Sequence, residues 1–267
     1  MYKNKTAIVT GGASGIGKEM CKYLTKRGAA VILADINKEA ARKTAEELDK
    51  NSGTCKWHHI DVTNQLDIED CVKETKKKFG KIDLIINNAA IGIDGEFKDI
   101  NLKQFKKVIE INLWGVIYGT YSVYPIMMEQ GYGQIVNVSS LAGLLPGGLM
   151  TSYTASKHAV TGFSLGLRPE AKEYGIKVNV LCPGFIETEI HDNTEKVSDY
   201  LNSEKNKRNK NRFPPAEKCI KSMMRGIEKD KAIIISPAAQ KIYWWMYRFC
   251  PNFILFAWEK IIKKLKK

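Results

Sequence analysis

Short apolar runs alternate with longer amphipathic segments through the first 180 residues of the chain. Six runs have the length and the β-branched content of strands: residues 6–10, 30–35, 54–60, 82–86, 133–139 and 177–181. Helix-length segments lie between them, at residues 15–27, 38–50, 65–79, 102–130 and 151–174. Strands and helices that alternate at this spacing predict an α/β fold, with one parallel sheet covered by helices on both faces.

The pattern changes after about residue 185. Residues 187–212 are polar and charged, a helix is predicted at 216–228, and an apolar strand at 232–236 brings the expected sheet to about seven strands. The remaining residues combine aromatic with basic side chains. The sequence therefore predicts one domain over residues 1–236 and a helical C-terminal extension over residues 237–267.

The net charge of +13 is confined to the end of the chain. Residues 1–204 carry 25 basic and 25 acidic side chains, whereas residues 205–267 carry 17 basic and 4 acidic ones. A nucleic-acid-binding domain spreads basic residues over its folded surface, so this distribution argues against a nucleic-acid partner. The longest nearly apolar stretch, residues 249–258, is shorter than the ~20 residues that cross a bilayer.

Six scattered cysteines form no CxxC pair, and no histidine stands at metal-ligand spacing. This usage indicates free thiols in a reducing compartment and no metal site. An apolar strand already begins at residue 6, which leaves no room for a signal peptide before it. We therefore expect a cytoplasmic protein, either free or peripheral on a membrane.

A glycine-rich turn, Thr10-Gly-Gly-Ala-Ser-Gly-Ile-Gly17, joins the first strand to the first helix. Glycines here permit a tight turn and close approach of the backbone to a pyrophosphate, while the helix N-terminus offers free N–H groups to the phosphates. Asp35 ends the second strand, where a carboxylate accepts hydrogen bonds from ribose hydroxyls and repels a 2′-phosphate. The turn predicts a doubly wound Rossmann domain that binds a dinucleotide, with NAD favoured over NADP.

A tyrosine and a lysine stand four residues apart in Tyr153-Thr-Ala-Ser-Lys157, which places them on one face of a helix. A nearby ammonium group favours the phenolate form of a tyrosine and so moves it towards acid–base chemistry. Thirteen residues before Tyr153, Ser140 follows a strand, at the sheet edge where open α/β folds bind ligands. These residues predict proton transfer to or from a substrate oxygen.

At this point the chain resembles the short-chain dehydrogenase/reductase family over about residues 5–190. The motifs that carry the resemblance are Thr10–Gly17, Asp61-Val62, Asn87-Asn-Ala-Ala90, Asn112, Ser140, Tyr153, Lys157 and Pro183-Gly184. Ala90 departs from the glycine that is usual in the family. The resemblance implies hydride transfer between a nicotinamide cofactor and an alcohol or ketone.

The resemblance implies a role for each matching residue. Tyr153 would be the general acid/base, Lys157 would bind the nicotinamide ribose and lower the pKa of Tyr153, and Ser140 would hold the substrate oxygen. Asn112 would support a water that relays protons from Lys157 to solvent. The expected cofactor-binding residues are Gly11, Ser14, Gly15, Ile16, Gly17, Asp35, Asp61, Val62, Asn88, Tyr153, Lys157, Pro183, Gly184, Ile186 and Thr188.

The expected substrate site is mostly apolar. We expect Ser140, Leu141, Leu149, Tyr153, Phe185 and Ile190 to contact the substrate, with residues of about 185–228 forming a lid over it. An apolar site with one polar centre suits a lipophilic secondary alcohol or ketone, such as a hydroxysteroid, a retinoid or a long-chain compound. One alternative is a 3-oxoacyl-thioester reductase, with the basic residues 205–212 contacting phosphates. A second is a non-catalytic NAD-binding scaffold or sensor.

Two further partners are expected. The family resemblance implies a homodimer, or a tetramer, that packs the helix carrying Trp114 and Tyr121 and the helix carrying Tyr153 against their mates. The extension combines Trp with Lys and Arg, as interfacial helices on anionic membranes do. The same aromatic residues would also suit a roof over the substrate site or a subunit interface.

Overall fold

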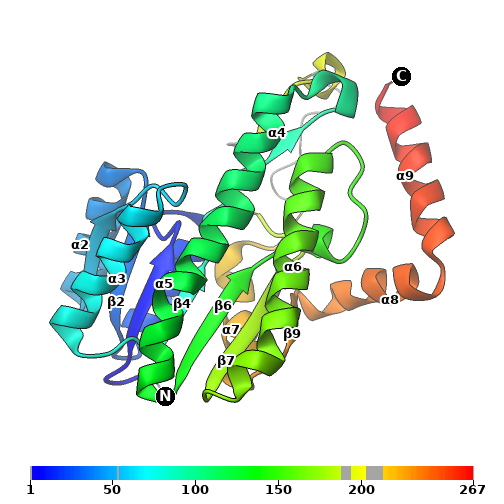
Figure 1. Cartoon of the computed structure of the whole chain (residues 1–267). Helices are drawn as coiled ribbons and strands as arrows, with labels where there is room; N and C mark the ends of the chain where they lie inside the picture. The colour runs from blue at the N-terminus through cyan, green and yellow to red at the C-terminus, as the bar shows by residue number, and fades with distance from the viewer. Residues whose placement is uncertain (1, 53, 188–193, 203–212, 267) are drawn as a thin grey trace.

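The computed structural model describes residues 2–52, 54–187, 194–202 and 213–266. Its centre is a seven-stranded sheet in the order β3-β2-β1-β4-β6-β7-β9, with every neighbouring pair parallel (Figure 1). The strands are β1 (Thr6–Thr10), β2 (Ala30–Asp35), β3 (Cys55–His59), β4 (Leu84–Asn87), β6 (Gly133–Val138), β7 (Ile176–Pro183) and β9 (Ile233–Ser236). The predicted doubly wound parallel sheet is confirmed.

Each central strand sends its side chains alternately to two apolar layers. In β1, Ala7 and Val9 join one buried cluster and Ile8 joins the other, as expected when successive side chains point to opposite faces. The helices are α1 (Gly15–Thr25), α2 (Lys38–Ser52), α3 (Gln65–Phe79), α4 (Leu102–Ile109), α5 (Gly115–Gln130), α6 (Thr151–Lys172) and α7 (Ala216–Glu228). Residues of α1, α2 and α7 line the first cluster, and residues of α3, α5 and α6 line the second.

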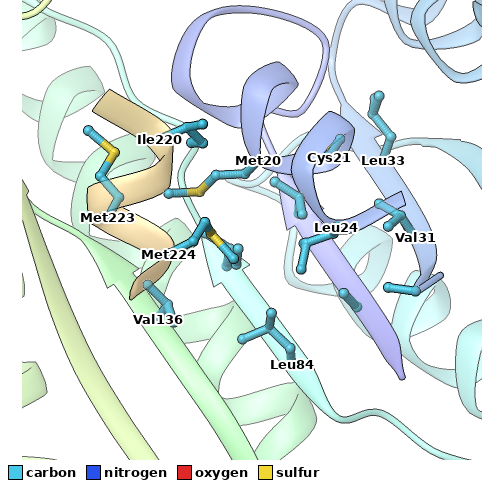
Figure 2. Close-up of a cluster of buried hydrophobic side chains, with 14 of the residues drawn as sticks. Met20, Cys21, Leu24, Val31, Leu33, Leu84, Val136, Ile220, Met223 and Met224 are labelled. Carbon is cyan, nitrogen blue, oxygen red and sulfur yellow. The ribbon is translucent and has the colours of Figure 1, made fainter. Parts of the chain in front are cut away.

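Helix α7 belongs to the main core. Ile220 and Met224 of α7 point towards Met20 of α1 above strands β4 and β6, and Met223 belongs to the same buried cluster (Figure 2). The last part of the predicted lid is therefore a core helix, because its amphipathic pattern buries a full apolar face against the sheet.

The predicted helix over residues 102–130 is interrupted. A π-helical turn, Glu110–Trp114, separates α4 from α5. A π turn inserts one extra residue per turn and is common at functional sites, whereas an apolar periodicity does not distinguish it from continuous α-helix. The expectation of a single helix was wrong at this point, and the turn carries Asn112.

Two short strands and two helices complete the described chain. Strands β5 (Ile93–Asp94) and β8 (Glu195–Lys196) form a separate parallel pair, which the sequence pattern did not predict. Helices α8 (Lys241–Phe249) and α9 (Pro251–Leu265) form the predicted extension and contain no buried residue. Helix α9 rises beside the N-terminal end of α6 and ends near α4 (Figure 1). Among the described residues, no helix has the length and apolar character needed to cross a membrane.

Candidate active site

The glycine-rich turn lies at the carboxyl edge of the sheet, between β1 and α1. Gly11 has φ +62°, a conformation that favours glycine, and a Cβ there would lie 2.9 Å from the Cα of Ala89. A Cβ on Gly17 would overlap the carbonyl oxygen of Gly11. Gly11 is therefore required where the turn packs against the segment after β4, and Gly17 where the turn packs against the start of α1.

The end of β4 supports this turn. The Asn88 side-chain amide donates hydrogen bonds to the carbonyl oxygens of Thr10 and Gly11, each at 3.0 Å. The backbone N–H groups of Asn88 and Ala89 both donate to Thr10 Oγ1, at 2.9 and 3.1 Å. Asn88 thus fixes the backbone of the glycine-rich turn from the end of β4, next to the predicted cofactor site.

The residues of the turn fit the pyrophosphate and ribose of a dinucleotide. The Ser14 side chain makes no capping hydrogen bond, and the first turn of α1 has no acidic residue, so nothing competes there for an anion. At the tip of β2, Asp35 Oδ2 accepts from the N–H of Ala13 at 3.0 Å, and Oδ1 accepts from the N–H of Asn37 at 2.9 Å. These bonds fix the Asp35 carboxylate beside the turn. The predicted residues Gly15 and Ile16 lie in the first turn of α1.

The two consecutive serines after β6 have different surroundings. Ser139 is buried, and its hydroxyl donates to the carbonyl oxygen of Lys157 at 2.8 Å and contacts Thr161 Oγ1 at 2.9 Å. Ser140 is half-buried, and its Oγ accepts from the N–H of Ala142 at 3.1 Å. The Ser140 hydroxyl also lies close enough to the Tyr153 phenol to lower its pKa. The structure therefore brings together Ser140 and Tyr153, the predicted pair, and gives Ser139 a packing role.

Lys157 is buried one helical turn beyond Tyr153 on α6. Only 1% of its side chain is exposed, and its ammonium Nζ donates to the Val138 carbonyl oxygen at 2.9 Å. The same Nζ lies 5.6 Å from the centre of the Tyr153 ring. Lys157 thus connects the catalytic face of α6 to the end of β6.

Burial shifts the pKa values of this pair in opposite directions. Desolvation raises the pKa of Tyr153 to about 12, opposed by the hydrogen bond with Ser140 and assisted by the nearby Asp94 carboxylate. Desolvation lowers the pKa of Lys157 to about 7. That Lys157 lowers the pKa of Tyr153 stays a prediction, and the shifts seen here follow from burial, which disfavours the charged form of both groups.

Asn112 is fully buried in the π-helical turn. Its Oδ1 accepts from the Ile91 N–H at 2.9 Å, and its Nδ2 donates to the Ile91 carbonyl at 3.0 Å and to Ser156 Oγ at 3.1 Å. The side chain therefore joins the segment after β4 to α6, one residue before Lys157. This anchoring is what the structure shows of Asn112, and its proton-relay role stays a prediction.

The residues expected around the adenine and the carboxamide have different surroundings, and their cofactor contacts stay predictions. Asp61 Oδ1 accepts from the N–H and the hydroxyl of Thr63 at 2.9 and 2.8 Å, and Val62 packs against Gly115. Pro183 ends β7, the Gly184 N–H donates to the Ser236 carbonyl at 2.9 Å, and Ile186 is buried in the main core. Thr188 lies outside the described residues.

The residues predicted to contact the substrate differ in burial: Leu141 is buried, Leu149 is half-buried and Phe185 is exposed. Leu141 is buried in a small cluster with Val180, Cys182 and Ile235. Leu149 is half-buried at φ +62°, and its carbonyl oxygen accepts from the Gly95 N–H at 2.7 Å. Phe185 is 43% exposed and stacks on Phe213 with ring centres 5.3 Å apart. Ile190 lies outside the described residues.

Three contacts at this edge were not foreseen. The Gln240 side chain accepts from the Phe185 N–H at 2.7 Å and donates to the Phe185 carbonyl at 3.2 Å. A Cβ on Gly148 would lie 2.8 Å from the Trp258 ring, so α9 crosses the loop before α6 closely. Asp94 acts on Tyr153 from β5. No motif or periodicity marks these residues, since each acts through a contact distant in sequence.

The described residues contain no cluster of three or more His, Cys, Asp or Glu side chains that would hold a metal ion. The candidate active site consists of a glycine turn, the Asp35 carboxylate and a Ser–Tyr–Lys group on one sheet edge. A family model for short chain dehydrogenases matches residues 5–198, which include all of these groups.

The chain belongs to the short-chain dehydrogenase/reductase family.

Curated members of the family align with most of the chain. The mouse 15-hydroxyprostaglandin dehydrogenase [NAD(+)] is 37% identical over 199 residues, which are 72% of this chain and 71% of that protein. The human protein of the same name is 37% identical, with 72% of each chain covered. An uncharacterized oxidoreductase of Bacillus subtilis is 32% identical over 70% of this chain and 73% of its own.

Solved structures of the family share the fold over most of the chain. A short-chain dehydrogenase/reductase from Burkholderia phymatum, in complex with NAD, has a TM-score of 0.84 and 25% identity and covers 94% of this chain and 95% of its own. An NAD+-bound xylitol dehydrogenase has a TM-score of 0.68 and 30% identity, with coverage of 69% and 72%. The fold and the site edge are thus those of this oxidoreductase family.

Proposed function

We propose that the protein is an NAD(H)-dependent oxidoreductase that interconverts a lipophilic secondary alcohol and its ketone. The observation that carries the proposal is the closeness of the Ser140 hydroxyl to the Tyr153 phenol, with buried Lys157 one helical turn away, at the sheet edge that also holds the glycine turn. Two hydroxyls that converge beside a dinucleotide site are what a carbonyl or alcohol oxygen requires.

The chain's own residues supply binding, orientation and a proton. The bound cofactor would accept hydride from the substrate carbon or return it. Ser140 would donate a hydrogen bond to the substrate oxygen, and Tyr153 would give its phenolic proton to that oxygen in reduction or take the hydroxyl proton in oxidation. Because the pKa of Tyr153 is about 12, its phenol is protonated at neutral pH and is ready for reduction.

NAD is the favoured cofactor because of Asp35. Its carboxylate stands at the end of β2 and is held by the N–H groups of Ala13 and Asn37, where it can accept bonds from two ribose hydroxyls. A 2′-phosphate at that position would meet a fixed negative charge. The names of the mouse and human relatives, and the NAD-bound family structures, support the same choice.

Apolar side chains in the segments after β7 and before α6 favour a lipophilic substrate. The partly exposed ring of Phe185 stacks on Phe213 and makes a T-shaped contact with Tyr243, with ring centres 6.3 Å apart. Trp258 of α9 lies over Gly148, next to Leu149. The relatives named after a hydroxylated prostaglandin, a lipid alcohol, support a lipophilic substrate for this chain as well.

A substrate panel tests this proposal. The full chain is assayed with a hydroxysteroid, a long-chain secondary alcohol and a short polar alcohol, each with NAD and with NADP, by the fluorescence of the reduced cofactor. We expect turnover of a lipophilic alcohol with NAD. Turnover of the short polar alcohol alone, or with NADP alone, would contradict the proposal.

We also propose a homodimer through α5. Trp114, Tyr121, Pro125 and Met128 are exposed and form one stripe along the helix at spacings of seven, four and three residues. Sedimentation of the chain and of its Tyr121→Glu variant tests the interface, because a buried charge there would dissociate the dimer. A variant that sediments as the unchanged protein does would contradict the interface.

We also propose that the aromatic and basic extension locates the enzyme at the surface of a membrane, where a lipophilic substrate is concentrated.

A further inference from the structure

Helices α8 and α9 each turn one side towards the body of the protein. On α8, the Tyr243 ring meets Phe185 edge-on, and Trp244 packs against the buried cluster that contains Leu141. On α9, Trp258 and Ile262 lie against Gly148. The inner side of the extension is thus fixed by contacts next to the active site.

The opposite side of both helices carries exposed apolar side chains. They are Ile242 (56% exposed), Trp245 (47%), Phe249 (75%), Phe253 (56%) and Phe256 (54%). The three residues of α8 are spaced three and four apart, so they share one face of the helix. Trp245 stacks on Phe249 with ring centres 5.8 Å apart and an interplanar angle of 11°. These large side chains have water on their outer side.

Three lysines continue this face along α9. Lys260, Lys263 and Lys264 are exposed, and Lys260 and Lys263 stand seven residues after Phe253 and Phe256. The Lys260 ammonium lies 5.1 Å from the centre of the Phe256 ring. We call the outer strip the set Ile242, Trp245, Phe249, Phe253, Phe256, Lys260, Lys263 and Lys264. Apolar side chains occupy one end of the outer strip and ammonium groups the other.

We propose that the outer strip binds the surface of an anionic lipid bilayer. Aromatic and aliphatic side chains would enter the interface between headgroups and acyl chains, and the three ammonium groups would meet the anionic headgroups. The inference deepens the membrane location proposed above. Binding to lipid does not depend on the proposed oxidoreductase activity, so the two can fail separately.

Charge decides between a bilayer and a second copy of the chain. Residues 241–267 contain seven basic residues and one acidic residue, Glu259, while residues 1–204 are neutral in sum. A dimer through this face would bring together two copies of the same basic segment, with only one carboxylate side chain in each copy to offset seven positive charges. An anionic bilayer instead offers negative headgroups to the ammonium end of the outer strip and an apolar interior to its other end.

Binding through the outer strip would leave the inner contacts unchanged. The same two helices that would lie on the bilayer hold Phe185 and cross Gly148 on their other side. The membrane-bound enzyme would thus keep its substrate site next to the lipid from which a lipophilic alcohol arrives.

Vesicle binding of the full chain tests the proposal. The NAD-saturated protein is sedimented with vesicles of phosphatidylcholine alone or with added phosphatidylserine, at low and high salt. We expect binding to the phosphatidylserine vesicles that weakens with salt, and a loss of about tenfold or more for the double variant Lys263→Glu/Lys264→Glu. Phe249→Ser should weaken binding several-fold.

Matched controls separate the outer strip from general charge and hydrophobicity. Lys77→Glu/Lys78→Glu reverses two exposed lysines in the last turn of α3, as the first double variant does in the last turn of α9. Leu66→Ser removes another exposed apolar side chain. Both controls should bind vesicles as the unchanged protein does, and all four variants should turn over a water-soluble substrate normally.

Equal losses in test and control variants, or no vesicle binding by the unchanged protein, would overturn the proposal. A change in sedimentation size of Phe249→Ser without vesicles, from dimer to monomer, would assign the outer strip to an interface between copies instead.

Discussion

The body of this chain and its aromatic, basic extension hold their functional residues in different ways. In the body, the site side chains are fixed by buried hydrogen bonds, as shown by Lys157 on Val138 and Asn112 on Ile91. In α8 and α9 no residue is buried, and eight large apolar side chains are exposed. Buried groups can carry chemistry that needs fixed geometry and shifted pKa values, whereas an exposed apolar and basic surface suits association.

Ser139 and Ser140 are adjacent in the body, and we expect their hydroxyl groups to serve stability and catalysis respectively. Ser140→Ala removes the hydroxyl that we propose to bond the substrate oxygen, and we expect kcat to fall about 100-fold with little change in stability. Ser139→Ala removes the buried hydroxyl that bonds Lys157 and Thr161, and should lower the free energy of unfolding by about 1 kcal/mol. Steady-state kinetics and urea unfolding of both variants check this. An equal loss of kcat in the two variants would contradict the assignment of Ser140, rather than Ser139, as the serine that bonds the substrate oxygen.

The pKa of Tyr153 predicts a directional response to pH. Its phenol is protonated below about pH 12, so the phenolate needed for alcohol oxidation grows about tenfold per pH unit through the neutral range. Carbonyl reduction uses the protonated form and should not gain from higher pH. Rates in both directions, measured between pH 6 and 10, check the sign. An oxidation rate that stays flat over this range would show that bound cofactor and substrate lower the pKa far below 12.

Replacement of Asp35 tests the predicted cofactor site in the body. Asp35→Ala removes the carboxylate held by Ala13 and Asn37, so KM for NAD should rise about tenfold. The same variant should accept NADP better than the unchanged protein, because a fixed negative charge is gone. Cofactor titrations with NAD and NADP measure both changes. If the ratio of KM for NAD to KM for NADP is the same in the variant, Asp35 does not determine which cofactor the protein prefers.

Two tryptophans test whether the extension has two separate sides. Trp258 faces Gly148 and the loop before α6, whereas Trp245 is exposed in the outer strip. Trp258→Ala should raise KM for a lipophilic substrate about fivefold, which is roughly 1 kcal/mol of binding, and Trp245→Ala should not change it. Kinetics without vesicles compare the pair. A rise of equal size in both would contradict the division.

The sequence predicted the body well because its signals are local. The strands Thr6–Thr10 and Ala30–Asp35 and the helix Gln65–Phe79 have the predicted bounds, since each is a short run of one periodicity that ends at a turn or a capping residue. Asn64 caps that helix through a bond from the Leu66 N–H at 3.1 Å. Motif spacing also placed Tyr153, Ser140 and the glycine turn on one edge.

Features that depend on distant contacts were missed. The π-helical turn at Asn112 is stabilised by bonds to Ile91 and Ser156, which no periodicity encodes. The pKa of Tyr153 depends on how much of the ring the fold buries. The Gln240 bonds to Phe185 and the pairing of β5 with β8 join segments more than 50 residues apart.

The most direct test of the central claim is the turnover of Tyr153→Phe. The change removes one hydroxyl from the proposed proton donor and leaves the glycine turn, Asp35 and the outer strip as they are. NADH fluorescence should show that the variant binds the cofactor with unchanged affinity, while its turnover of a lipophilic secondary alcohol falls by about 10²- to 10⁴-fold. A variant that turns over this alcohol as fast as the unchanged protein would contradict the assignment of Tyr153, and with it the proposed chemistry of the site.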